Sequence, residues 1–148
     1  MATIAVVLDS AEANEQLLET AKRHVTGTDL EIVLCRIVDR DEYEGDVRRQ
    51  AESSERVDSI EEVEREAKAE AEAVGEKFFG DDVSFTAVGA IGTIPEDVIK
   101  IADEWDTNHV FIAGKKRSPA GKMLFGDEAQ KLILDFYGPV TVVTENSS

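Results

Sequence analysis

The sequence predicts an α/β fold: a single doubly wound, five-stranded parallel sheet with helices on both faces. Short apolar runs rich in β-branched residues recur five times, and helix-like segments of about ten residues or more separate them. This alternation implies right-handed crossovers and therefore a parallel sheet that is covered on both faces. The 148 residues suffice for one such domain, which we expect to span residues 1–148.

Each predicted strand is a nearly continuous apolar run, the pattern of strands buried on both faces. The strands are expected at Thr3–Leu8, Leu30–Val38, Val83–Ala90, Val110–Ala113 and Val140–Val143. Ligands bind such sheets at the carboxyl ends of the strands, where the winding reverses. The loops at those ends are expected to begin at Asp9, Asp39, Gly89 and Gly114.

Four helices are predicted from apolar residues that step by three or four. They follow Asp9-Ser10, Ser53 or Ser54, Thr93 and Asp127, and the last two starts carry an acid or amide at capping-box spacing. The segment from Asp39 to Glu52 is charged and lacks periodicity, so we expect an exposed loop or a frayed helix start. The expected buried stripes are Leu17, Leu18, Ala21 and Val25; Val57, Ile60, Val63, Ala67, Ala71, Val74 and Phe78; Val98, Ile101, Ala102 and Trp105; and Ala129, Leu132, Ile133 and Phe136.

The net charge of −16 argues against a nucleic-acid partner, because phosphate backbones demand a basic surface. The self-repulsion at this charge density is a cost that concentrated salt screens. We therefore expect a protein of a saline cytoplasm, whose melting temperature rises as KCl goes from about 0.1 M to several molar. The first residues have neither a basic region nor an uninterrupted apolar span, which indicates a cytoplasmic protein without a signal peptide or membrane helix.

The one cysteine and the two histidines are assigned to structure. Cys35 lies within an apolar run, where a small buried hydrophobe is expected, and a single cysteine can form no internal disulfide. His24 lies on an amphipathic helix and His109 opens a strand, and neither has a nucleophile or carboxylate at a recognisable catalytic spacing.

One loop departs from the acidic character of the chain. Residues 107–126 hold no acid and four bases, whereas residues 41–82 hold sixteen acids and six bases. The basic loop also contains glycines 114, 121 and 126 ahead of a predicted helix, and glycines at such a turn let backbone amides approach a phosphate. It is not a P-loop, because Lys116 stands where glycine is required and Met123 where Ser or Thr must bind magnesium. The alternative interpretation is a loop that merely pairs with the acidic surface.

The whole chain resembles the universal stress protein family, whose fold is Rossmann-like. The resemblance rests on AVVLD at the end of the first strand, IVD at the end of the second, GxxPED at the third helix and the closing PVTVV. In the family, a loop with the pattern Gly, two residues, Gly, nine residues, Gly and Ser or Thr wraps the ribose and phosphates of ATP. Gly114 and Gly126 match its first and last glycines, but Arg117 replaces the second glycine and Asp127 the hydroxyl residue.

The resemblance implies a nucleotide site in which Asp9 and Ile37 hold the adenine while the basic loop surrounds the phosphates. The loop residues are Gly114, Lys115, Lys116, Arg117, Gly121, Gly126 and Asp127. ATP, with Mg²⁺ as its counterion, is the implied cofactor. Simpler interpretations stay open: Asp9 and Asp127 as ordinary helix caps, and Ile37 as a core residue.

Three functions follow as hypotheses. The first is a stress-response module that binds ATP or another adenine nucleotide and acts through partners without an active site of its own. The second, favoured by Arg117 and Asp127, is a homodimeric module that binds no nucleotide. The third is a slow ATPase, for which the sequence offers no identifiable base. Family members pair their last strands, and Val140–Val143 lacks the charges that would blunt an exposed edge, so we expect a homodimer through this strand.

Overall fold

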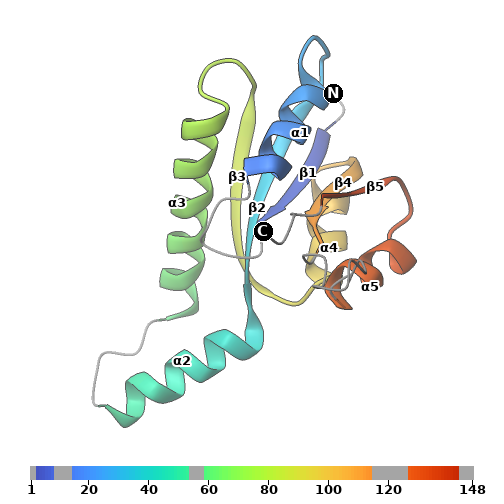
Figure 1. Ribbon diagram of the computed structural model, residues 1–148. Coiled ribbons are helices and arrows are strands. Elements are labelled where there is room, and N and C mark those ends of the chain that lie inside the picture. The colour runs from blue at the N-terminus through green and yellow to red at the C-terminus, as the bar shows by residue number, and fades with distance from the viewer. Residues whose placement is uncertain (1–2, 9–14, 54–58, 115–126, 144–148) are drawn as a thin grey trace, which may run out of the picture.

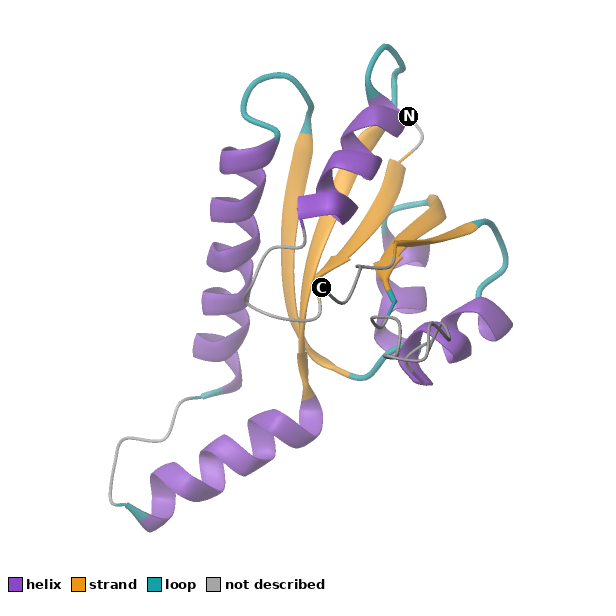
Figure 2. Ribbon diagram, viewed as in Figure 1, coloured by secondary structure: helices purple, strands orange, loops and turns teal. Residues whose placement is uncertain are grey.

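The computed structural model describes residues 3–8, 15–53, 59–114 and 127–143. Its five strands form one parallel sheet in the order β3-β2-β1-β4-β5 (Figures 1 and 2). The strands are β1 (Thr3–Leu8), β2 (Glu31–Asp39), β3 (Phe85–Gly92), β4 (Thr107–Ala113) and β5 (Val140–Val143). The predicted doubly wound five-stranded sheet is confirmed.

Helices cover both faces of the sheet, so the core has two layers. Side chains of α1 (Glu15–Val25) and α3 (Ile60–Phe78) pack on one face with Ile4, Val6 and Leu34. On the other face, α4 (Glu96–Glu104) and α5 (Asp127–Asp135) pack with Val7 and Ile112. Alternate residues of each strand thus point to opposite layers, as the pleat of a strand requires. None of the described helices is long and apolar enough to cross a membrane.

Helix α3 packs closely against β3, without room for a Cβ atom at two glycines of the contact. A Cβ atom on Gly89 of β3 would overlap with backbone atoms of Glu64, Ala67 and Lys68 in α3. A Cβ atom on Gly75 of α3 would overlap with the ring of Phe85 in β3. The buried residues of α3, Ala67, Ala71 and Gly75, are all small, and this allows the helix to lie so close to the strand.

The segment predicted as an exposed loop or frayed helix start is a full helix, α2 (Arg40–Glu52). The carboxylate of Asp39 accepts hydrogen bonds from the backbone N–H groups of Asp41 and Glu42, at 2.9 and 3.2 Å, and so caps its first turn. No residue of α2 is buried, and the helix projects away from the sheet below α3 (Figure 1). Periodicity missed it because a helix with no buried side needs no apolar stripe.

Several predicted boundaries also need correction. Helix α3 begins at Ile60 with Ser59 as its N-cap, and not at Ser53 or Ser54; Ser53 ends α2. The third strand starts at Phe85 and continues through Gly89 to Gly92, and the fourth starts at Thr107 and not at Val110. Both strands are longer at one end because backbone pairing continues where the apolar run stops.

Three of the described residues predicted to be buried are exposed, and Val57 lies outside the described residues. Ile60 lies in the first turn of α3, Trp105 is the C-cap of α4, and Ile133 lies on the outer side of α5. The first two stand at helix ends, where a helix runs past the sheet that would cover it. The expected capping box of α4 is also modified: the Thr93 hydroxyl donates to Glu96 at 3.0 Å, but the Thr93 N–H donates to the carboxylate of Asp97 at 2.7 Å.

Candidate functional site

The winding of the sheet reverses beside β1, and this places the candidate site. The chain moves from β1 outward to β2 and β3, then crosses to β4 on the other side of β1 and continues to β5. The carboxyl ends of β1 and β4 are therefore neighbours, with Val6 of β1 in register with Phe111 of β4. Open α/β sheets bind ligands outside the carboxyl ends of their strands at such a reversal.

Gly114 is the first residue of the basic loop, and the structure describes it at this edge. Its backbone N–H donates to the carbonyl of Val143 at 2.8 Å, so the start of the loop is fixed to the end of β5. The other loop residues predicted to contact phosphates, Lys115, Lys116, Arg117, Gly121 and Gly126, lie outside the described residues, as does Asp9.

Asp127 is the first residue of α5, so the predicted helix start is confirmed, although its side chain is outside the described part. An amino end of a helix carries about half a positive charge and free N–H groups. Gly114 and α5 flank the basic loop in the chain.

Ile37 lies near the end of β2 with its side chain buried in the layer of α4 and α5. Its backbone carbonyl accepts a hydrogen bond from Nη1 of Arg36 at 2.5 Å. Nε of Arg36 in turn donates to the carboxylate of Glu70 in α3 at 2.9 Å. The side chain of Ile37 is therefore part of the core and is not available for contact with an adenine base.

The Arg36–Glu70 pair was not anticipated from the sequence. Arg36 is a buried cation within a strand of apolar residues, and a buried charge requires a partner of opposite sign. That signal, an arginine within LCRIV, was present in the sequence. The partner could not be identified, because α3 offers a carboxylate at almost every turn.

The structural assignment of Cys35 agrees with its surroundings. The thiol is fully buried, and burial raises its pKa to about 12, so the reactive thiolate is suppressed at neutral pH. Within the described residues, no group of three or more His, Cys, Asp or Glu side chains is arranged to hold a metal ion.

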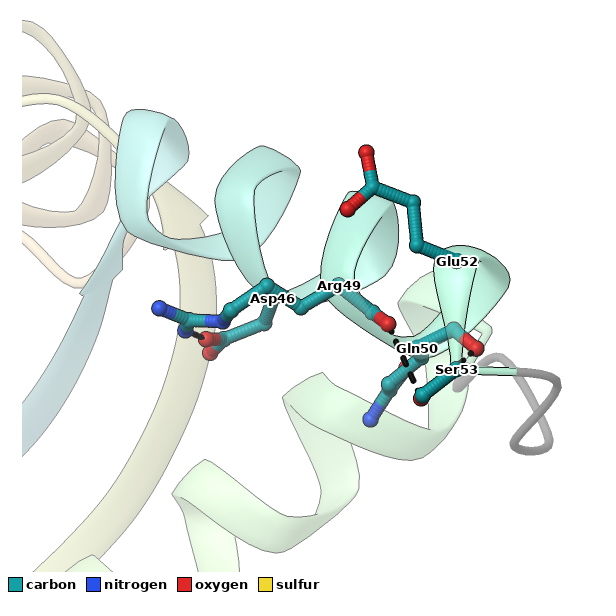
Figure 3. A pocket seen from close by; sticks show the side chains of 5 residues that line it. All are labelled: Asp46, Arg49, Gln50, Glu52 and Ser53. Carbon is teal, nitrogen blue, oxygen red and sulfur yellow. Dashed lines mark hydrogen bonds and ion pairs between the residues drawn. The ribbon is translucent and has the colours of Figure 1, made fainter.

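A hollow of about 620 Å³ lies beside the last turns of α2, away from the winding reversal (Figure 3). The described residues that line it are all polar: Asp46, Arg49, Gln50, Glu52 and Ser53. Arg49 forms an ion pair with Asp46, and the Ser53 hydroxyl donates to the Arg49 carbonyl at 2.9 Å. None of these side chains is aromatic, so they offer no ring on which a nucleotide base could stack.

The fold and the winding reversal define a parallel α/β protein of the class that binds ligands at its strand ends. The model of the universal stress protein family matches residues 1–144, and the chain therefore belongs to this family. No curated protein sequence matches the chain.

Solved structures agree with this fold over nearly the whole chain. The hypothetical protein MJ0577 is 20% identical, with 99% of this chain and 97% of that chain covered and a TM-score of 0.73. A universal stress protein in complex with cAMP is 14% identical, with 96% and 95% covered and a TM-score of 0.55. The universal stress protein of Archaeoglobus fulgidus in complex with dAMP is 16% identical, with 96% and 97% covered and a TM-score of 0.53.

Proposed function

We propose that this protein is a stress-response module that binds an adenine nucleotide, with ATP as the expected ligand, at the carboxyl ends of β1 and β4. Three features carry the proposal: the winding reversal beside β1, the strongly basic loop that begins at Gly114, and the amino end of α5, which follows this loop in the chain. Structures with this fold were solved with cAMP and dAMP, which supports an adenine ligand.

In this proposal the two ends of the nucleotide are recognised differently. The backbone of Ile37 and the side chain of Asp9 would hold the adenine. Lys115, Lys116 and Arg117 would lie beside the phosphates, with Gly121 and Gly126 allowing close approach of the backbone. Binding by backbone and basic groups requires no catalytic base, so the proposal assigns no reaction, and Mg²⁺ would enter only with the phosphates of ATP.

Mass spectrometry of the purified, undialysed protein would test the proposal first. An adenine nucleotide released on denaturation is the expected result. Calorimetry with ATP, AMP and cAMP would then separate recognition of the base from recognition of the phosphates. A protein that carries no nucleotide and releases no heat with any of the three would contradict the proposal and favour the module without nucleotide.

Two variants would localise the site. Gly126→Val should abolish binding, because a side chain at a point of close backbone approach blocks the ligand. The matched control is Gly45→Val, since a Cβ atom at Gly45 of α2 meets nothing within 4 Å. Loss of binding in both variants would mean that the effect of Gly126→Val is not local.

Asp127→Ser should strengthen ATP binding. It removes a negative charge from the amino end of α5, where a charge matters by about 0.3 to 2 kcal/mol. Asp135→Ser removes the same charge from the other end of the same helix and should leave affinity unchanged. Equal affinities of the Asp127→Ser and native proteins would show that Asp127 does not decide ATP binding.

The proposed assembly is a homodimer through β5. This strand forms one edge of the sheet and pairs only with β4, and its four residues carry no charge. Sedimentation at micromolar protein concentration in high salt would measure it. A stable monomer under these conditions would contradict the dimer while leaving the nucleotide site to its own test.

A further inference from the structure

The two histidines of the chain lie in ring contact, although 84 residues separate them in the sequence. His24 is in the last turn of α1 and His109 is in β4. Their ring centroids are 4.9 Å apart and the rings meet edge to face. A chain of 148 residues with only two histidines has brought both to one place.

The pair connects three elements. The ring of His109 stacks on Phe111 with centroids 4.4 Å apart, and the ring of His24 meets Phe111 edge-on at 5.3 Å. A hydrogen bond of 2.8 Å joins Nε2 of His109 to the hydroxyl of Thr141 in β5. Phe111 is buried, so the imidazoles form the outer layer of contact between the end of α1 and the β4–β5 edge.

The described strands around the histidine pair contain no carboxylate. The segments β1, β4 and β5 contain no Asp, Glu, Lys or Arg, and His109 is their only group that titrates near neutral pH. Charged residues come from α1, which carries Lys22 and Arg23 in its last turn and Glu15 and Glu19 further back. Asp135 and Tyr137, which precede β5, are exposed.

We infer that His24 and His109 form an acid-sensitive contact that holds the end of α1 to the β4–β5 edge when neutral and loosens this edge when protonated. Two imidazolium groups in ring contact repel one another. The charged form of His109 is also disfavoured, because its partly buried ring is poorly solvated. Burial and, second, the charge of His24 lower the pKa of His109. Cation–π attraction to Phe111 acts in the opposite direction, so the experiment must weigh it.

The sign of the pH dependence follows from linkage. A histidine whose pKa is lower in the folded edge than in the open chain binds protons more readily when the edge opens. The contribution of the neutral histidine contact to stability is therefore complete above the ordinary histidine pKa of about 6.5, and it is lost as the pH falls below this value. Carboxylates with ordinary or lowered pKa values titrate further toward acid, so the pH window separates the two kinds of group.

The 148-residue chain at constant high salt allows a direct test by NMR, because its two histidines should give two imidazole signals. Titration from about pH 8 to about pH 5 should give His109 a midpoint below that of an unfolded histidine. His24→Gln should raise the midpoint of His109. Any difference that then remains between this midpoint and that of an unfolded histidine measures the effect of burial. His24 is exposed, so this variant should fold, and an unchanged amide spectrum outside the pair verifies it.

Hydrogen exchange tests the consequence for the edge. The amides of Val110 and Gly114 donate to the carbonyls of Pro139 and Val143, so they report on the β4–β5 connection. Their protection should fall with acid, relative to the β1–β2 amides, about tenfold for each pH unit by which the midpoint of His109 is lowered from its unfolded value. In His109→Gln, whose amide can donate to or accept from the Thr141 hydroxyl, the protection ratio should not depend on pH in this window.

Two results would overturn the inference. The first is a His109 midpoint at or above that of an unfolded histidine, which would mean that the attraction to Phe111 prevails. The second is an equal pH dependence of the protection ratio in the native protein and in His109→Gln. Neither result depends on nucleotide binding or on dimer formation.

Discussion

The two edges of the sheet differ in what surrounds them. The edge strand β3 has eight uncharged residues, but Arg40, Glu64, Lys100 and Glu104 line a hollow of about 330 Å³ beside Val88–Ile91. The edge strand β5 has four uncharged residues, and the helix that precedes it exposes apolar side chains. Leu134 is 82% exposed, Ile133 is 47% exposed, and Tyr137 is fully exposed.

This difference teaches that the protection of an edge strand lies partly outside the strand. Of the two edge strands, β3 is the longer one without charged residues. Judged by the strands alone, β3 would be the edge expected to pair with another chain. Charged side chains from α2, α3 and α4 resist the approach of a second sheet there, whereas apolar groups on α5 favour it beside β5. The proposed homodimer through Val140–Val143 is therefore better supported by the surroundings of β5 than by its sequence.

The interior of the β3 side offers the largest expected effect. Gly89→Ala places a Cβ atom into the backbone of α3, which cannot yield as a flexible side chain can. We expect a loss of about 3 kcal/mol in the free energy of unfolding, measured by urea denaturation. Gly45→Ala, in the open interior of α2, should instead stabilise by about 0.5 to 1 kcal/mol. A loss below about 0.5 kcal/mol in Gly89→Ala would show that α3 adjusts freely.

The apolar groups beside β5 give the next effect. Leu134→Glu should weaken the homodimer by about 2 kcal/mol, because it places a charge beside the proposed interface. Ile60→Glu is the matched control, since Ile60 is an exposed apolar residue of α3 on the other side of the sheet. Sedimentation of both variants in high salt gives the dissociation constants. Equal weakening by the two substitutions would remove α5 from the interface.

The Arg36–Glu70 pair joins β2 to α3, and its effect should be smaller. Glu70→Gln leaves a buried guanidinium without its carboxylate partner, a loss that reaches several kcal/mol for a fully buried pair. The carboxylate of Glu70 is one-third exposed, and water can replace part of the interaction, so we expect about 1 kcal/mol. Glu72→Gln, on the exposed side of α3, should have no measurable effect in the same denaturation experiment.

The order and type of the elements could be predicted because buried strands and amphipathic helices leave periodic apolar patterns. α2 could not, because its formation rests on the Asp39 cap and on helix-forming residues without packing. Ile60, Trp105 and Ile133 show a related limit: periodicity gives the side of a helix that faces the core, but not how far the core extends.

The candidate site was predictable as a location, because the winding reversal follows from strand order and the basic loop from composition. Gly114 follows β4 and α5 begins at Asp127, as the sequence predicts, while the binding of a nucleotide between them stays a proposal. The hydrogen bond from Arg36 to the Ile37 carbonyl and the Arg36–Glu70 pair could not be predicted, since they depend on which carboxylate of α3 meets β2. The contact of His24 with His109 likewise depends on the packing of α1 over β4, which spacing in the sequence does not reveal.

The two sides of the sheet should also differ in their response to acid, and this gives the smallest expected effect. At the end of β3, a hydrogen bond to its own backbone N–H and the Thr93 hydroxyl lower the pKa of Glu96. A carboxyl group with a lowered pKa stabilises the fold fully above its ordinary value near 4.5, and this contribution is lost as the pH falls through the folded value. On acidification, the histidine contact at β5 should therefore weaken before the turn at β3.

Thr93→Val tests the β3 part of this order, because it removes the hydroxyl and keeps the shape of the side chain. The pKa of Glu96, followed by NMR of its side-chain carboxyl, should move toward its ordinary value without reaching it, since the larger cause is the backbone N–H. Thr86→Val, at an exposed position within β3, should leave the pKa of Glu96 unchanged. Because Glu96 is fully exposed, the change should be visible in its titration and scarcely in global unfolding. A Glu96 pKa that is identical in the native and Thr93→Val proteins would assign the whole shift to the backbone.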